Sequence, residues 1–178
     1  MDIQVKRSRR RSVRLEVKNG AVRVLAPYFT SKREILDFVE KHRSWIEKQL
    51  KASAEAQNVP ALTESEMRQL KEQAQAILPV KAAAYGKRLQ VAYGKITVRF
   101  QKTRWGSCSS KGNISFNALL MRAPEEVQDA IVVHELCHLK EMNHSKAFYD
   151  LVRSVYPQYD ECMKWLKKNG RSLMAALR

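Results

Sequence analysis

Alternating hydrophobic and polar residues predict a β-hairpin near the start of the chain. The alternation runs from Val13 to Leu25 and is interrupted at Asn19-Gly20, a pair suited to the positive φ angles of a type I′ turn. A two-residue loop fixes three cross-strand pairs: Val17 with Val22, Leu15 with Val24, and Glu16 with Arg23. The first two pairs are expected to face a core and the third to face water.

Helical spacing replaces the alternation after Pro27. Thr30 or Ser31, followed by Glu34, has the pattern of a helix N-cap with a capping box, and the helix is predicted to continue to about Ala56. Its apolar stripe consists of residues three or four apart: Ile35, Phe38, Val39, His42, Trp45, Ile46 and Leu50. His42 has no ligand-type side chain at a suitable spacing, so we interpret it as a packing or capping residue.

A second long helix is predicted after a linker at residues 58–60. Thr63 and Glu66 repeat the capping-box pattern, and the inner face of this helix carries Met67, Leu70, Ala74, Ile77 and Leu78. Pro79 is expected to kink or end it. The linker divides the chain into a basic hairpin-and-helix region, residues 1–60, and a core domain, residues 61–178.

Strand patterns return in the middle of the core domain. Ile96, Val98 and Phe100 alternate with polar residues, and so do Ile114 and Phe116, after a turn that contains Lys111-Gly112. Between the two strands lies the segment 103–108, Thr-Arg-Trp-Gly-Ser-Cys. We expect it to line a cleft. Arg104 would supply a hydrogen-bond donor and Trp105 an apolar floor, and Gly106 would let another backbone segment approach closely.

Three further helices are predicted downstream. Pro124, followed by Glu125 and Glu126, is typical of a helix start, because proline suits the first turn and acidic side chains suit the positive end of the helix dipole. Helical spacing also covers residues 145–155, and a final helix is predicted around residues 160–168.

The helix that starts at Pro124 contains a His-Glu-x-x-His motif. His134 and His138 are four residues apart, so both imidazoles project from one face, at a spacing that suits a divalent metal ion. Glu135 reaches the edge of the same site and is predicted to act as a general base on metal-bound water rather than as a ligand. A purely structural histidine cluster is the alternative, but the apolar residues around the motif favour a buried helix with its polar face turned to a cleft.

A third ligand requires the chain to fold back after His138. Asn tolerates the left-handed conformation, so Asn143 is predicted to end the helix and His144 to complete a three-histidine site with one open position. Two alternatives remain open: Glu161 as the third ligand, or Cys108 as a fourth ligand that would close the site and make the metal structural.

Composition is typical of an ordinary folded protein. The chain has 178 residues, of which 44% are hydrophobic, and no apolar run approaches the roughly 20 residues that cross a bilayer. The charged start leads into no signal-peptide segment. Three cysteines without Cys-x-x-Cys spacing indicate free thiols. We therefore expect a cytoplasmic protein with no membrane partner, and the sequence leaves its oligomeric state open.

The net charge of +15 suggests a nucleic-acid or other acidic partner. The excess is largest in residues 1–51, which contain 14 basic and 6 acidic residues. Two interpretations of the run from Lys6 to Arg14 stay open: a solvated strand edge, or a contact for nucleic acid or an acidic surface.

Taken together, the segment 103–108, the His-Glu-Leu-x-His sequence and the following Asn-His resemble the YgjP-like metallopeptidase family. The N-terminal hairpin and helix are similar to that family too. The resemblance implies an α+β, zincin-like fold, in which a small antiparallel sheet packs on the active-site helix, related to SprT-like and WLM-type proteases. It also implies that zinc is held by His134, His138 and His144, with Glu135 as the catalytic base.

The chemistry so implied is peptide-bond hydrolysis through a metal-activated water. Arg104, Tyr149 and Tyr156 are candidates for stabilising the oxyanion, and Tyr149 is grouped with Arg104, Trp105 and Gly106 in the candidate substrate cleft. An extended peptide is expected to pair with the strand near residues 114–117. Two other functions remain: a nucleic-acid-binding protein with a structural or degenerate zinc site, and a protease that acts on proteins bound to nucleic acid.

Overall fold

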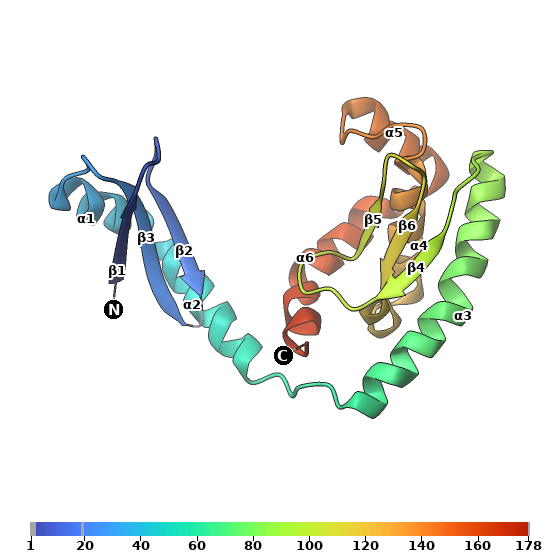
Figure 1. Ribbon diagram of the computed structural model, residues 1–178, viewed down its shortest axis with the longest axis horizontal. Coiled ribbons are helices and arrows are strands. Elements are labelled where there is room, and N and C mark those ends of the chain that lie inside the picture. The colour runs from blue at the N-terminus through green and yellow to red at the C-terminus, as the bar shows by residue number, and fades with distance from the viewer. Residues whose placement is uncertain (1–2, 19, 178) are drawn as a thin grey trace. The chain divides into compact units, whose positions relative to one another are not determined.

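The computed structural model describes residues 3–18 and 20–177 and divides into two compact units, Met1–Val59 and Pro60–Arg178 (Figure 1). The first unit is built on a three-stranded sheet in the order β1-β3-β2. Strand β3 (Ala21–Pro27) pairs in parallel with β1 (Ile3–Ser8) and antiparallel with β2 (Arg14–Lys18). The β2-β3 hairpin has the predicted register. Gly20 has a φ of 76°, and Asn19 lies outside the described residues.

Two helices, α1 (Lys32–Lys41) and α2 (Arg43–Gln57), replace the single helix predicted after Pro27. Ser31 caps α1 with the predicted capping box. The division falls at His42, which is the C-cap of α1 and whose Nδ1 lies 2.7 Å from the Phe38 carbonyl oxygen. The capping role predicted for His42 is therefore confirmed. The core of the unit consists of Val22, Val24, Ala26, Ile35, Val39 and Ile46.

The second unit begins with α3 (Glu64–Leu89), capped by Thr63 and Glu66 as predicted. The helix does not end at Pro79 but continues to a left-handed C-cap at Gln90. The remaining helices are η1 (Ala118–Arg122), α4 (Glu125–Cys137), α5 (Lys146–Val155) and α6 (Tyr159–Ala175). Helix α4 packs against α3, α5 and α6 and contributes much of the buried core (Figure 1).

A second sheet, in the order β4-β6-β5, lies against α4. Strand β6 (Ile114–Asn117) pairs in parallel with β4 (Ile96–Arg99) and antiparallel with β5 (Gly106–Cys108). The predicted α+β class, with a small sheet packed on the motif-bearing helix, is confirmed, but the sheet is mixed rather than antiparallel. Because β6 has a partner on both sides, the expected pairing of a peptide with residues 114–117 is wrong. The edges of this sheet are β4 and β5.

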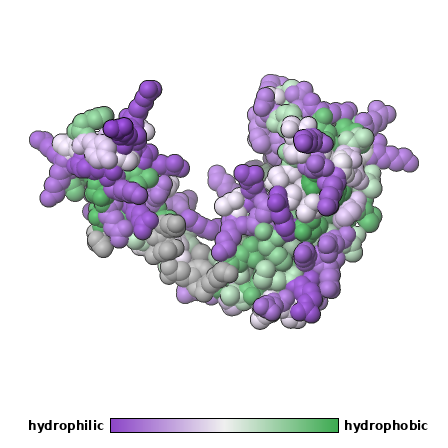
Figure 2. Space-filling model, viewed as in Figure 1, coloured by the Kyte–Doolittle hydropathy of each residue, from purple (hydrophilic) through white to green (hydrophobic). Residues whose placement is uncertain are grey.

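Hydrophilic residues cover much of each unit on the face seen in Figure 2, and each unit also shows areas of hydrophobic residues on that face. No helix among residues 3–18 and 20–177 is long and apolar enough to span a bilayer. Cys108, Cys137 and Cys162 are free thiols, as predicted.

Candidate metal centre

Helix α4 positions the first part of the motif. It starts after Pro124 with Glu125 and Glu126 in the first turn, as predicted, and most of its later residues are buried. The helix ends at Cys137, so His134 lies in its last turn and His138 is its C-cap. Because the helix axis is fixed by burial on several sides, the two histidines are held at a rigid end rather than on a mobile loop.

The three predicted histidines come together. One nitrogen from each of His134, His138 and His144 lies within 4.8 Å of the others, and the Nε2 atoms of His134 and His144 are 3.1 Å apart. Two nitrogen ligands of one tetrahedral zinc ion are about 3.3 Å apart, given zinc–nitrogen bonds of about 2.05 Å. The spacing therefore fits a small divalent cation.

The chain reverses after His138 through backbone hydrogen bonds rather than through a left-handed residue. The amides of Lys140 and Glu141 both donate to the Cys137 carbonyl oxygen. Among the described residues other than glycine only Gln90 has a positive φ, so the conformation predicted for Asn143 is wrong. Ser145 then caps α5 by accepting from the Phe148 amide, and His144 immediately precedes that cap.

Hydrogen bonds at Nδ1 orient the histidines of α4. The Nδ1 of His138 lies 3.1 Å from the Glu141 carbonyl oxygen, which can only accept, so this nitrogen carries the proton and Nε2 keeps its lone pair. The Nδ1 of His134 lies 2.7 Å from the Tyr159 hydroxyl, which can accept in the same way. Sequence analysis missed Tyr159, because nothing in the spacing of α6 relates it to a motif 25 residues earlier.

The two histidines of α4 favour the neutral form that metal binding needs. Burial lowers the pKa of His134 to about 3, with the charges of His138 and His144 contributing further. Burial is also the main reason that the pKa of His138 is lowered. Neutral imidazoles with available lone pairs suit a cation and would be a poor site for an anion.

Phe148 forms the apolar floor of the cluster. Its fully buried ring stacks on His138 with the centroids 4.5 Å apart, and it meets His134 and His144 edge-on at 4.9 and 5.0 Å. The sequence predicted only that Phe148 lies in a helix over residues 145–155. Its contacts with all three rings restrict their rotation and so preorganise the cluster.

Glu135 faces the cluster from the same helix and is only 5% exposed. Burial raises the pKa of its carboxyl group to about 8. The side chain packs directly on Gly106 of β5, where an added Cβ would lie 2.5 Å from Oε1 of Glu135. The neighbour of Gly106 is thus the Glu135 side chain rather than the backbone segment that was predicted, and only glycine leaves room for it.

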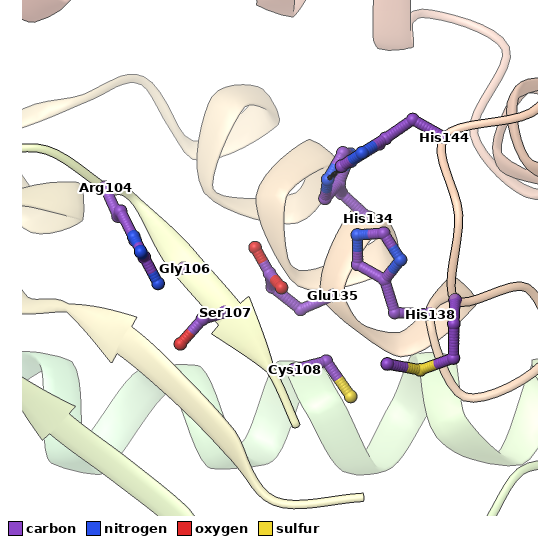
Figure 3. A pocket seen from close by; sticks show the side chains of 9 residues that line it. Arg104, Gly106, Ser107, Cys108, His134, Glu135, His138 and His144 are labelled. Atoms are coloured by element: carbon purple, nitrogen blue, oxygen red, sulfur yellow. Dashed lines mark hydrogen bonds between the residues drawn. The ribbon is translucent and has the colours of Figure 1, made fainter. Parts of the chain in front are cut away.

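A cavity of about 280 Å³ joins these groups (Figure 3). Figure 3 shows Arg104, Ser107 and Cys108 on the β5 side and Glu135 with the histidines on the other. The residues that line this cavity are Arg104, Gly106, Ser107, Cys108, His134, Glu135, His138, Met142 and His144.

Two residues expected in the cleft do not line this cavity. The Trp105 ring packs near Gly170 of α6, where an added Cβ would lie 3.0 Å from it. Tyr149 stacks on the outer side of His144, with ring centroids 6.0 Å apart. Tyr156 is also absent from the lining and packs edge-on against Tyr85 of α3.

The alternative ligands do not join the histidines. Among residues 3–18 and 20–177, the group that could hold a metal contains His134, His138 and His144 but neither Cys108 nor Glu161. Cys108 lines the cavity, yet burial and the nearby Glu135 raise the pKa of its thiol, which disfavours the thiolate that binds metal. The cluster thus leaves one side open to the cavity.

Comparisons with known proteins show what the chain is similar to. The family model for the YgjP-like metallopeptidase domain matches residues 11–69 and 55–169. A curated relative, UTP pyrophosphatase of Escherichia coli (strain K12), is 33% identical over 85 residues, which are 47% of this chain and 51% of the relative. The match thus spans about half the length of that relative.

Two solved structures match part of this chain. The metallopeptidase zymogen abylysin of Pyrococcus abyssi is 24% identical, with a TM-score of 0.48, over 53% of this chain and 97% of its own. The zymogen jannalysin of Methanocaldococcus jannaschii is 22% identical, with a TM-score of 0.45, over 51% and 95%.

Proposed function

Because the chain belongs to the YgjP-like metallopeptidase family, we propose that it is a zinc-dependent hydrolase whose active site is formed by the three histidines and Glu135. The observation that carries this proposal is the convergence of three imidazoles beside a buried carboxyl group in one cavity. Burying the Glu135 carboxyl group and the His138 imidazole is costly to the fold by itself. Together they suit a metal-dependent hydrolase.

His134, His138 and His144 would hold the ion through Nε2. When bound, zinc would supply positive charge that polarises a substrate carbonyl or phosphoryl oxygen and makes a nearby water more acidic. Tyr159 and the Glu141 carbonyl oxygen hold the rings of His134 and His138 in the required tautomer. Phe148 keeps water away from their inner side.

Glu135 acts as the general base. A carboxylate in a buried site binds a proton more strongly than one in water, so its raised pKa favours taking a proton from the attacking water. The same carboxyl group then donates that proton to the leaving group. Contact with Gly106 holds the side chain at the cavity wall during both transfers.

Arg104 is our choice among the three candidates for oxyanion stabilisation, because it lines the cavity, whereas Tyr149 and Tyr156 do not. The buried Asn117 side chain fixes this part of the loop by donating at 2.7 Å to the carbonyl oxygens of both Gln101 and Arg104. The bond fixes the backbone from which the Arg104 guanidinium extends, and that guanidinium can donate to negative charge that develops in the cavity.

For a peptide substrate, the edge strand β5 offers the place to bind. It borders the cavity through Gly106, Ser107 and Cys108, and in this sheet its only strand partner among the described residues is β6. An extended peptide added to that edge would pass beside Glu135. Backbone hydrogen bonds would then supply affinity with little side-chain selectivity.

Hydrolysis of a nucleoside triphosphate is the second candidate, favoured by the resemblance to a UTP pyrophosphatase. The arginines near the cavity suit a phosphate chain as well as a peptide oxyanion. The same Glu135 and histidines would serve either reaction, because both need a water deprotonated beside a polarised centre.

Assaying both reactions on one zinc-loaded preparation decides between them. A quenched-fluorescence peptide library and UTP are offered side by side to the wild type, Glu135→Gln and His138→Ala. We expect hydrolysis of one substrate class, lost by at least about 100-fold in both variants. A Glu135→Gln protein with full turnover would contradict the mechanism for either substrate.

The sequence-based alternative of a nucleic-acid-binding protein with a structural zinc has less support. A closed structural site needs a fourth protein ligand, and the described residues supply three. In the basic run, Arg7 is already engaged, because one of its nitrogens donates to the carbonyl oxygens of Pro27, Tyr28 and Thr30. The rest of the run stays a candidate contact for an acidic partner.

A further inference from the structure

A second cavity, of about 380 Å³, lies on the polar face of the β4-β6-β5 sheet and adjoins the metal centre. The two cavities share Arg104, Ser107 and Cys108 in their linings. Strand register places Thr97, Ser115 and Ser107 in one row across β4, β6 and β5, and all three line the second cavity. A substrate bound at the first cavity could therefore extend along this row of hydroxyl groups.

Two arginines border the row. Arg99 is two residues beyond Thr97 on β4, and its Nε donates at 2.8 Å to Oγ of Ser115, which is only 7% exposed. Arg104 is fixed through its backbone by Asn117. Neither guanidinium forms an ion pair with a carboxylate in the described part of the chain, so both charges lack an internal partner.

The wall of the second cavity carries no compensating negative charge, because its lining contains no acidic residue. Along the sequence, no Asp or Glu occurs between Glu72 and Glu125, whereas nine Lys and Arg residues do. Two guanidinium groups beside hydroxyl donors, in a segment of the sequence free of acids, form a potential that attracts anions.

We propose that this cleft is a subsite for an oxyanion of the substrate, either a phosphate or a carboxylate group, bound by Arg99 and Arg104 with the hydroxyl row. The inference deepens the proposed function, on which it rests for the existence of a substrate at the adjoining metal centre. Arginine suits the role because its planar fork donates two parallel hydrogen bonds to such a group. The bond from Nε to Ser115 holds Arg99 in place and leaves its terminal nitrogens for the ligand.

Binding by the zinc-loaded full chain tests the subsite without requiring turnover. Calorimetric titration with inorganic pyrophosphate and with N-acetylglutamate amide compares the wild type, Arg99→Gln and Lys111→Gln. Lys111 is a matched control because it is exposed in the same acid-free segment and does not line the cavity. We expect Arg99→Gln to lower the affinity for the preferred anion about tenfold and Lys111→Gln to change that affinity little. Added salt should reduce the difference in affinity between wild type and Arg99→Gln.

The two probes distinguish the sources of the anion: stronger binding of pyrophosphate indicates a phosphate chain, and stronger binding of the glutamate derivative indicates an acidic peptide side chain. Equal affinity of wild type and Arg99→Gln for both probes would overturn the proposal, as would an equal loss in Lys111→Gln. Arg99-dependent binding by a protein that hydrolyses neither the peptide library nor UTP would instead overturn the proposed function and leave the subsite standing. Thermal melting and zinc content of each variant verify that it is folded and loaded.

Discussion

At the scale of single residues, the site depends on contacts between the motif and side chains remote in sequence. Gly106 leaves room for the Glu135 side chain, and Phe148 contacts all three histidine rings. The Tyr159 hydroxyl lies within hydrogen-bond distance of Nδ1 of His134. Only the first of these contacts left a signal in the sequence, as a glycine inside an otherwise bulky segment. His134, Glu135 and His138 were predictable because one helix fixes their spacing, and His144 was predicted from the need for the chain to fold back after His138. Their supporting residues were not, since tertiary packing alone brings them near.

Tyr159→Phe tests the support of His134. The variant keeps the ring but loses the hydroxyl 2.7 Å from Nδ1, so the imidazole is less well oriented. We expect zinc affinity, measured by competition with a chromophoric chelator, to fall by about 10-fold. Tyr149→Phe is the matched control, because Tyr149 contacts His144 through its ring, which phenylalanine retains. Unchanged affinity in Tyr159→Phe would show that the hydroxyl does not position the ligand.

Glu135→Gln tests the cost of the buried carboxyl group in metal-free protein. The folded-state pKa, about 8, lies above the ordinary value of 4.5, so the folded state binds the proton more tightly than the unfolded state. Wild-type stability therefore decreases as pH rises from 4.5 to about 8, whereas glutamine does not titrate. The melting temperature of Glu135→Gln, relative to wild type, should rise across this window and level off above it. A difference independent of pH would contradict the raised pKa.

At the scale of elements, local patterns predicted the helices better than the sheets. Capping boxes at Ser31 and Thr63 and the acidic start of α4 lie where the sequence indicated, because these signals act within one turn. The alternation in β4 and β6 identified strands but not their pairing. Their parallel arrangement depends on how the chain crosses over, which a period of two residues does not encode. The helix through Pro79 likewise reflects packing that overrides a local breaker.

Helix α3 is tied to α4 by an ion-pair network whose removal is measurable. The Lys81 ammonium lies 2.7 Å from both Glu125 and Asp129, with the lysine side chain 14% exposed and that of Asp129 18% exposed. Lys81→Met should lower the free energy of unfolding by about 1–3 kcal/mol, because Asp129 loses its charged partner at a half-buried position.

The control for this network is Glu125→Gln, where the altered side chain is 75% exposed and a much smaller loss is expected. Urea denaturation of both variants at neutral pH gives the comparison. The hydrogen-bonded carboxylates raise the pKa of Lys81 against the opposing effect of burial, so the lysine contribution persists through neutral pH and is lost only as pH rises above about 10.5. An equal loss of unfolding free energy in Lys81→Met and Glu125→Gln would contradict the prediction that the more buried side chain contributes more.

At the scale of the whole molecule, hydrolytic groups and basic surface are combined in one chain. The unit Pro60–Arg178 contains the candidate metal centre, the carboxyl group proposed as the general base and the proposed anion subsite, whereas the unit Met1–Val59 carries the basic run near its start. Sequence reasoning noted that basic run because it is contiguous. It identified Arg104 as a cleft residue but missed Arg99, since only the β4-β6-β5 sheet brings Arg99 beside the hydroxyl row.

The central claim is that His134, His138 and His144 bind a catalytic metal ion. Elemental analysis of wild type and His144→Ala, purified side by side and reconstituted with zinc under identical conditions, tests it most directly. The account predicts close to one zinc per chain in wild type and a large loss in the variant, with both proteins folded by circular dichroism. A wild type that retains no metal after reconstitution, or a His144→Ala protein that retains all of it, would contradict the account.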